Sequence, residues 1–230
     1  MSEPLGVRYI QATKSFRQGD RDLPVLAGVT FDVQPGEFVA LMGPSGSGKS
    51  TLLNLTAGID KPSAGKVLVG DHDPSSMGEN QLSDWRRQFV GFVFQRYHLV
   101  NLLTAAENVE LALLLFKLPK AERRRRVHSA LELVGLADRA KHYPRQLSGG
   151  EEQRVAIART IVNDPALILA DEPTGDLDEK SAQEILGLLS LLNQSFGKTI
   201  IMVTHDPTAA KFAHRTMHLH KGNFYEAARA

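Results

Sequence analysis

A short segment rich in glycine and hydroxyl side chains carries the most specific chemical signal of the chain. It reads GPSGSGKST and directly follows the apolar run Phe38–Met42. The spacing G-x-x-x-x-G-K-[ST] after a strand is that of a phosphate-binding loop, in which glycines allow a tight turn and backbone N–H groups point at phosphate oxygens. We therefore predict that the nucleotide is held by Gly43, Pro44, Ser45, Gly46, Ser47, Gly48, Lys49, Ser50 and Thr51.

Three side chains of this loop suit ATP with Mg²⁺. Lys49 places a positive charge on the β- and γ-phosphates, and the Ser50 hydroxyl is a ligand for Mg²⁺. Thr51 is placed to reach a phosphate nearer the ribose. A Gly- and Ser-rich turn can also be an ordinary loop, but the strand before it and the helix expected after it favour a phosphate site.

A second segment, LILADE at residues 167–172, is an apolar strand that ends in two carboxylates. Asp171 would hold Mg²⁺ at the carboxyl edge of the sheet, where α/β proteins bind ligands. Glu172 would polarise the water that attacks the γ-phosphate. An Asp-Glu pair alone is more often a solvated turn, but a phosphate-binding loop in the same chain favours catalysis.

The elements that must position these residues alternate between strands and helices, which predicts an α/β fold with a mostly parallel sheet. Several of the strands are apolar throughout, as strands buried on both faces should be. The predicted strands are Val7–Ala12, Thr30–Val33, Phe38–Met42, Val67–Val69, Gly91–Phe94, Leu167–Ala170, Thr199–Thr204 and Thr216–His220.

Between residues 96 and 163 the pattern becomes helical. Thr104 and Glu107 predict a capping box ahead of an apolar run through Phe116, with Pro119 ending that helix. A second amphipathic helix follows, with apolar positions Val127, Ala130, Leu131 and Val134, and a later helix carries Ile185, Leu188, Leu189 and Leu192. We expect a helical subdomain inserted into the α/β core.

Composition narrows the class of protein. The 230 residues suit one domain, and 27 basic against 26 acidic side chains give a net charge of +1, which does not indicate a nucleic-acid-coating surface. There is no cysteine, and the most apolar stretch, 109–116, is far shorter than the ~20 residues of a membrane-spanning helix. We expect a soluble cytoplasmic chain without a signal peptide.

The segment LSGGE, residues 147–151, resembles the signature motif LSGGQ of ABC-transporter ATPases. Other family landmarks occur in order: Gln95 in GFVFQ resembles the Q-loop, TGDLD ending at Asp178 the D-loop, and His205 in VTHD the switch histidine. Phe16 stands at the aromatic position that stacks on adenine. The resemblance covers essentially the full chain and implies a P-loop NTPase core at 1–95 and 164–230, an N-terminal antiparallel β subdomain, and a helical signature subdomain at 96–163.

The resemblance also implies a mechanism. Two subunits dock head to tail, and each ATP lies between the phosphate loop of one subunit and the signature of the other. The residues implied at the signature side are Ser148, Gly149, Gly150, Glu151 and Asp178. Catalysis is assigned to Glu172, His205, Gln95 and Lys49, and Mg²⁺ to Ser50, Gln95 and Asp171.

The phrases VGFVFQRYHLVNLLTAAENVEL and LADEPTGDLDEKSA are similar to the bacterial group of macrolide-export (MacB), lipoprotein-release (LolD) and cell-division (FtsE) ATPases. Glu151 departs from the usual glutamine, and Asp176 from a frequent asparagine. The group implies a membrane permease partner with a periplasmic domain, an attachment to the cytoplasmic side of the inner membrane, and a docking surface at residues 95–103. The alternative is an ABC ATPase acting on nucleic acid or ribosomes.

Overall fold

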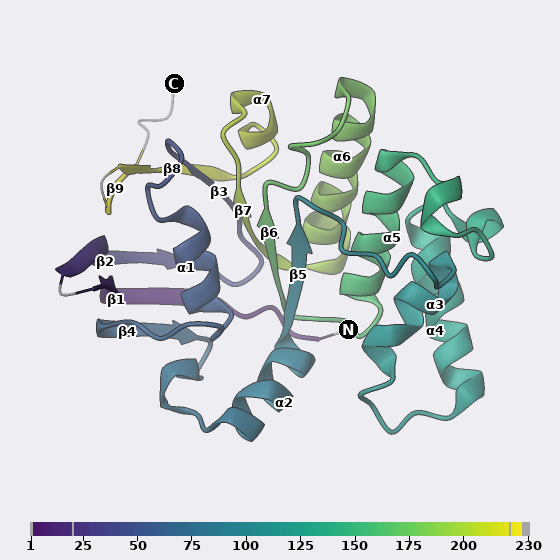
Figure 1. Ribbon diagram of the computed structural model, residues 1–230, viewed down its shortest axis with the longest axis horizontal. Coiled ribbons are helices and arrows are strands. Elements are labelled where there is room, and N and C mark those ends of the chain that lie inside the picture. Colours follow the sequence, from purple (N-terminus) through teal and green to yellow (C-terminus); the bar gives the residue numbers. More distant parts are fainter. Residues whose placement is uncertain (1, 20, 221, 227–230) are drawn as a thin grey trace.

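The computed structural model describes residues 2–19, 21–220 and 222–226, and it contains two sheets (Figure 1). The smaller sheet is antiparallel, with the strand order β2-β1-β4. Its strands are β1 (Val7–Gln18), β2 (Arg21–Val33) and β4 (Ala64–Val69).

The larger sheet has the order β5-β6-β7-β3-β8-β9 and is parallel except for its edge strand β9. In this order β3, the strand before the phosphate loop, lies next to β7. β7 in turn lies next to β6, the strand that leads to Asp171 and Glu172. The strands are β3 (Phe38–Met42), β5 (Val90–Phe94), β6 (Leu167–Asp171), β7 (Thr199–Val203), β8 (Arg215–His220) and β9 (Asn223–Glu226).

Helices cover the larger sheet, and α3, α4 and α5 lie together at one end of the molecule (Figure 1). In the segment 96–163, which is described in full, there are helices and no strand. The α-helices are α1 (Lys49–Thr56), α2 (Glu79–Phe89), α3 (Ala105–Glu110), α4 (Lys120–Leu133), α5 (Gly149–Ile161), α6 (Glu179–Phe196) and α7 (Pro207–Ala210).

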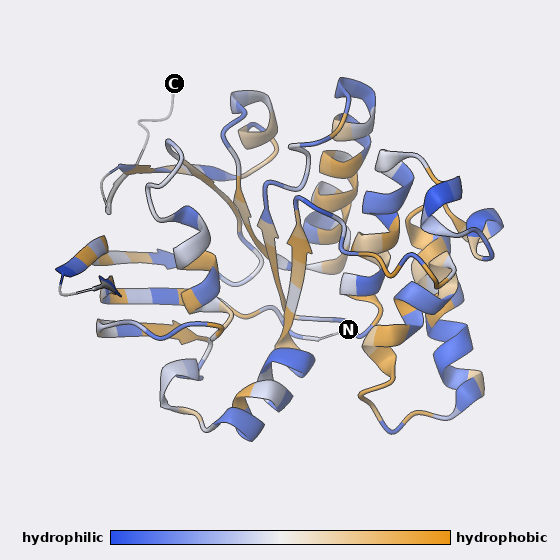
Figure 2. Ribbon diagram, in the orientation of Figure 1, coloured by the Kyte–Doolittle hydropathy of each residue, from blue (hydrophilic) through white to orange (hydrophobic). Residues whose placement is uncertain are grey.

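Two hydrophobic cores lie on opposite faces of the parallel sheet, and the alternation along β3 shows the division. Phe38 and Ala40 belong to the core that includes residues of α3, α4, α5 and α6. Val39 and Leu41 belong to the core that includes residues of α1, α2 and the antiparallel sheet. Figure 2 shows the resulting pattern, with hydrophobic central strands and hydrophilic outer faces on the helices.

The predicted mixed α/β fold is confirmed, and several boundaries differ from the prediction. β1 and β2 are longer than expected, because shifts of register between residues 9 and 15 interrupt the alternation of side chains. The capping box of Thr104 and Glu107 is present, but the α-helix ends at Glu110 and continues as a 3-10 turn, Leu111–Leu113. The expectation that this helix runs through Phe116 to a stop at Pro119 was therefore wrong, since Pro119 instead precedes α4 as its N-cap.

The helices α2 and α7 and the strand β9 were not predicted. The helix α2 buries Leu82 and Trp85 and packs a partly buried Phe89 against the same core, so an amphipathic spacing of i, i+3 and i+7 is present in its sequence. β9 is a short edge strand.

Over the described ranges no helix is long and apolar enough to cross a membrane. In the same ranges no cluster of three or more His, Cys, Asp or Glu side chains could bind a metal.

Candidate functional site

Four of the predicted site segments begin where neighbouring parallel strands end. β5 leads to Gln95, β6 ends in Asp171, β7 leads to His205, and β3 leads to the phosphate loop. Because the carboxyl ends of parallel strands share one edge of a sheet, these segments meet there. They line one cleft of about 640 Å³, together with Val25, Phe94, Arg96, His98 and Val203.

Glycine is required at two positions of the phosphate loop. Gly43 has φ 151°, and a Cβ there would lie 2.2 Å from the carbonyl oxygen of Leu219 in β8. Gly48 has φ 102°, and a Cβ there would lie 2.9 Å from the Leu26 side chain. The loop therefore combines left-handed backbone with a close approach to β8 and β2, which no larger residue allows.

The first turn of α1 follows this loop without a capping side chain. Its N-cap is Gly48, which makes no side-chain hydrogen bond, and the first turn contains no acidic residue. The N-terminal end of a helix carries partial positive charge and unsatisfied N–H groups. This end of α1 can therefore receive a phosphate.

Lys49 is buried and lines the cleft. Its Nζ donates to the carbonyl oxygens of Gly43, at 2.7 Å, and Pro44, at 3.0 Å. Both acceptors are neutral. The ammonium group therefore brings a net positive charge to the loop, where a phosphate would bind.

Asp171 and Ser50 lie together at the end of β6. Burial raises the pKa of the Asp171 carboxyl, and the neighbouring Glu172 charge raises it further, whereas a hydrogen bond with Ser50 and the charge of Lys49 lower it. A half-buried carboxylate beside a hydroxyl is a set of hard oxygen donors. Such a set fits Mg²⁺, which takes few protein ligands and retains phosphate oxygens and waters as the others.

Glu172 has an unusual backbone conformation and a histidine partner. Its φ is 50°, a left-handed value that costs a non-glycine residue of order 1–3 kcal/mol. Nδ1 of His205 lies 2.5 Å from Oε2 of Glu172, and the His205 side chain is 70% exposed. The turn thus aims the Glu172 carboxylate into the cleft beside an imidazole, as a water-activating pair requires.

Gln95 lines the cleft but also contacts the loop after β6. Its Nε2 donates to Oδ1 of Asp176 at 2.9 Å. A Cβ at Gly175 would lie 3.0 Å from the same nitrogen, so the two segments pack closely. The Asp176 carboxylate therefore accepts a hydrogen bond from Gln95.

Phe16 does not line this cleft. It lies in β1, is 42% exposed, and has the Lys14 ammonium 4.9 Å from its ring centroid. Lys14 is held in turn by Asp60, at 2.5 Å. The ring is therefore on the surface and supported from one side by a cation, which leaves its stacking on adenine a prediction.

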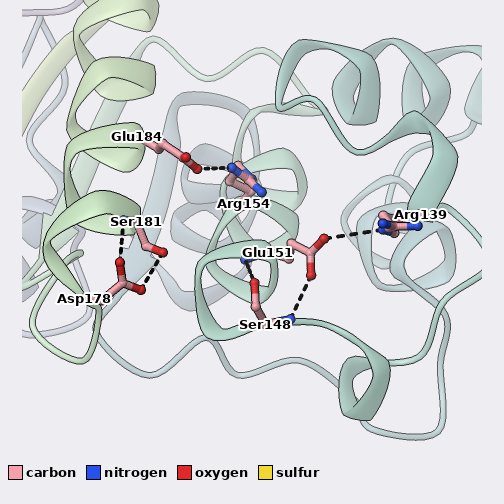
Figure 3. Close-up of polar contacts among 7 residues, drawn as sticks. All are labelled: Arg139, Ser148, Glu151, Arg154, Asp178, Ser181 and Glu184. Atoms are coloured by element: carbon pink, nitrogen blue, oxygen red, sulfur yellow. Dashed lines mark hydrogen bonds and ion pairs between the residues drawn. The ribbon is translucent and has the colours of Figure 1, made fainter.

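The signature residues also lie outside the cleft, beside the D-loop (Figure 3). Ser148 is the N-cap of α5, and it forms a capping box with Glu151: Oγ of Ser148 accepts from Glu151 N at 3.2 Å, and Ser148 N donates to Oε2 of Glu151 at 2.8 Å. Asp178 is the N-cap of α6 and accepts from both N and Oγ of Ser181.

Close packing joins these two helix ends. A Cβ at Gly150 would lie 2.8 Å from Oγ of Ser181, so glycine is needed where α5 approaches α6. Arg154 of α5 also pairs with Glu184 of α6 (Figure 3). The signature motif and the D-loop therefore form one continuous surface of the same subunit.

Local hydrogen bonds lower the pKa of two carboxyl groups at this surface, those of Glu151 and Asp178. Hydrogen bonds from Ser148, with a smaller effect of Arg139, lower the pKa of the Glu151 carboxyl, so Glu151 is negatively charged at neutral pH. Nε of Arg139 lies 3.4 Å from Oε1 of Glu151 (Figure 3). Hydrogen bonds from Ser181 lower the pKa of the Asp178 carboxyl.

Sequence reasoning missed several residues of the cleft. Arg96 and His98 lie one and three residues after Gln95, and His98 has φ 49°. Val25 reaches the cleft from β2. Neither residue type nor spacing marks these positions, because their place depends on the turn after β5 and on the packing of β2 against the loop.

The comparisons with known proteins agree with this arrangement. Residues 26–175 match the sequence profile of the ABC transporter family. The chain is 50% identical over 91% of both chains to the uncharacterised ABC transporter ATP-binding protein YvrO of Bacillus subtilis. It is 48% identical to the macrolide export ATP-binding/permease protein MacB of Marinobacter nauticus, over 93% of this chain and 33% of MacB.

A solved structure is similar over nearly the full length. It is the dimeric post-hydrolysis state of the ATP-binding cassette MJ0796, from Methanocaldococcus jannaschii, bound to ADP and Pi. The TM-score is 0.87 at 41% identity, covering 97% of this chain and 100% of that chain.

Proposed function

Because this chain belongs to the ATP-binding subunits of ABC transporters, and is an ATPase of that family, we propose that it powers a separate membrane permease by nucleotide-driven closure of a dimer. The observation that carries the proposal is that the phosphate loop and the signature motif lie apart within one chain. The cleft contains the phosphate loop, whereas Ser148 and the signature glycines lie beside the D-loop. The signature surface therefore needs the ATP of a second copy.

Within one site, the roles follow from position. The phosphate loop and Lys49 bind the phosphates of ATP, and Ser50, Asp171 and Gln95 would hold Mg²⁺. That ion, when bound, neutralises charge on the β- and γ-phosphates. Glu172 accepts a hydrogen bond from the attacking water, and His205 holds the Glu172 carboxylate and stabilises developing charge. The products are ADP and phosphate.

Across the dimer, Ser148, Gly149 and Gly150 would face the γ-phosphate of the partner, with Glu151 and Asp178 beside them. Hydrolysis removes the phosphate that joins the two subunits, so closure and opening alternate with the nucleotide state. Residues 96–163 would act as the signature subdomain, and 1–95 with 164–230 as the core.

A membrane partner is supported by the relatives. The MacB relative is named as an ATP-binding and permease protein. Our protein covers 33% of its length. We propose a separate permease with a periplasmic domain, which places this chain at the cytoplasmic side of the inner membrane. The exposed Leu102 (86%) and Val100 (43%) lie in the expected docking segment.

One experiment distinguishes the transporter function from the alternative, an ABC ATPase acting on nucleic acid or ribosomes. The tagged chain is purified from detergent-solubilised membranes and its partners are identified by mass spectrometry. A stoichiometric membrane subunit supports the transporter function. Bound RNA or DNA without a membrane subunit would refute it and favour the alternative.

A further inference from the structure

Gln153, in the second turn of α5, joins three parts of the molecule through one buried amide. Its side chain is fully buried, at 0% exposure. Nε2 donates both of its hydrogens, one to the carbonyl oxygen of Phe94 at 3.1 Å and one to the carbonyl oxygen of Pro173 at 2.7 Å. The signature helix is thereby bonded to the end of β5 and to the loop after β6.

The two acceptors flank the residues that face ATP. Phe94 directly precedes Gln95, and Pro173 directly follows Glu172. A displacement of α5 would therefore act on the peptide groups next to both side chains. The hydrogen bond of Gln95 to Asp176 adds a second link between the same two segments, so β5 and the loop after β6 are held together at this point.

The backbone at Glu172 needs such support. Its left-handed conformation persists only where the surrounding structure holds it in place. Glu172 N donates to Val203 O at 3.0 Å, and Gly175 N donates to Glu172 O at 3.0 Å. The bond from Gln153 to Pro173 is the link that attaches this strained turn to α5.

Packing alone does not explain an amide at this position. Oε1 of Gln153 is buried and has no hydrogen-bond partner among the described atoms. A buried polar atom without a partner costs free energy, so an apolar side chain of similar size would avoid that cost. The two bonds made by Nε2 are what the amide provides and an apolar side chain cannot.

We propose that Gln153 is a positioning residue that makes the placement of Glu172 and Gln95 depend on the position of the signature helix. The inference rests on the proposed function. In the dimer, the N-terminal end of α5 contacts the ATP of the partner, and Gln153, one turn along the same helix, holds the catalytic loop of its own subunit. Docking at one ATP is thus transmitted to hydrolysis at the other.

A matched control lies on the same helix. Oγ1 of Thr160 donates to the carbonyl oxygen of Phe92 at 2.9 Å, so it also bonds α5 to β5. Thr160 is nearly as buried as Gln153, at 8% exposure, but does not contact the loop after Glu172. Replacing Thr160 by valine removes a comparable bond between helix and strand without touching the catalytic loop.

The test compares Gln153→Met and Thr160→Val in the full chain, by steady-state ATPase kinetics, nucleotide titration and thermal unfolding. For Gln153→Met we expect kcat to fall about tenfold or more, with KM and the Kd for ATP within about twofold, because misplaced catalytic groups slow the chemical step rather than binding. For Thr160→Val we expect kcat within about twofold of the parent.

Two results would overturn the inference. One is a Gln153→Met variant whose kcat stays within about twofold of the parent. The other is a loss of kcat that is equal in both variants and follows their loss of thermal stability. If Gln153→Met does not fold, Gln153→Asn is used, since it keeps the amide but shortens its reach, and an unchanged kcat there has the same meaning. An unaltered chain without ATPase activity would instead refute the proposed function itself.

Discussion

Replacing Glu172 by glutamine tests the assignment of the catalytic carboxylate. The change keeps the length and shape of the side chain, so the turn and its contact with His205 can persist. It removes the carboxylate to which we assign the acceptance of a proton from water. Loss of a general base costs about 10²–10⁴ in rate. At ~1.36 kcal/mol for each factor of ten, this equals about 3–5 kcal/mol of transition-state stabilisation.

Binding should respond differently from catalysis. The phosphate loop, Lys49 and the end of α1 are unchanged, and the variant removes a negative charge beside a site for an anion. We therefore expect ATP to bind at least as tightly as to the parent. Because hydrolysis no longer removes the γ-phosphate, the variant should accumulate as an ATP-bound dimer.

The assay measures phosphate release, ATP binding and molecular mass in solution with ATP present. The control is Glu132→Gln, which makes the same chemical change on the exposed surface of α4, where Glu132 is 57% exposed. That control should match the parent in all three measurements. If Glu172→Gln hydrolysed ATP at the parent rate, the role assigned to Glu172 would be wrong.

Three further changes test other parts of the argument. Ser50→Ala should raise the KM for MgATP about tenfold and leave the affinity for Mg²⁺-free ATP within about twofold. Titrations with and without a chelator measure both effects. If the substitution weakened MgATP and Mg²⁺-free ATP equally, Ser50 would not be a metal ligand. Leu102→Glu should abolish recovery of the membrane subunit, whereas Leu23→Glu, also at an exposed leucine (53%), should not. Tyr9→Phe removes a buried bond to Thr56 and should lower the free energy of unfolding by about 1 kcal/mol in urea. Burial raises the pKa of the Tyr9 phenol, so its contribution to stability is complete below pH ~10 and declines above it, a decline that Tyr9→Phe should lack.

Contiguous motifs could be predicted because their chemistry is local. The phosphate loop needs glycines at fixed positions and a strand directly before it, and both requirements are visible in the sequence. The apolar strand before Asp171 predicted that this carboxylate lies at the carboxyl edge of the sheet, whereas Gln95 and His205 were implied by the resemblance to ABC ATPases. The capping box at Thr104 could be predicted because it depends only on residues three apart.

Contacts between distant segments could not be predicted. The bond of Gln95 to Asp176 joins residues 81 apart, and those of Gln153 reach 59 and 20 residues. No sequence pattern indicates which groups accept the hydrogen bonds of an amide side chain inside a helix. The true length of β1 was hidden for a related reason, since its register shifts are defined only by pairing with β2 and β4.

The helix α5 would have two roles in the proposed dimer. Its first turn presents Ser148 and the signature glycines on the surface shared with the D-loop, whereas its next turn holds the backbone beside Glu172 through Gln153. In the proposed dimer, two symmetric subunits would each place this surface against the cleft of the other, so the same contact would complete both ATP sites. Each helix would then sense one nucleotide and position the catalytic loop for the other. Hydrolysis would therefore depend on a closed dimer even though each cleft already contains its own Glu172 carboxylate.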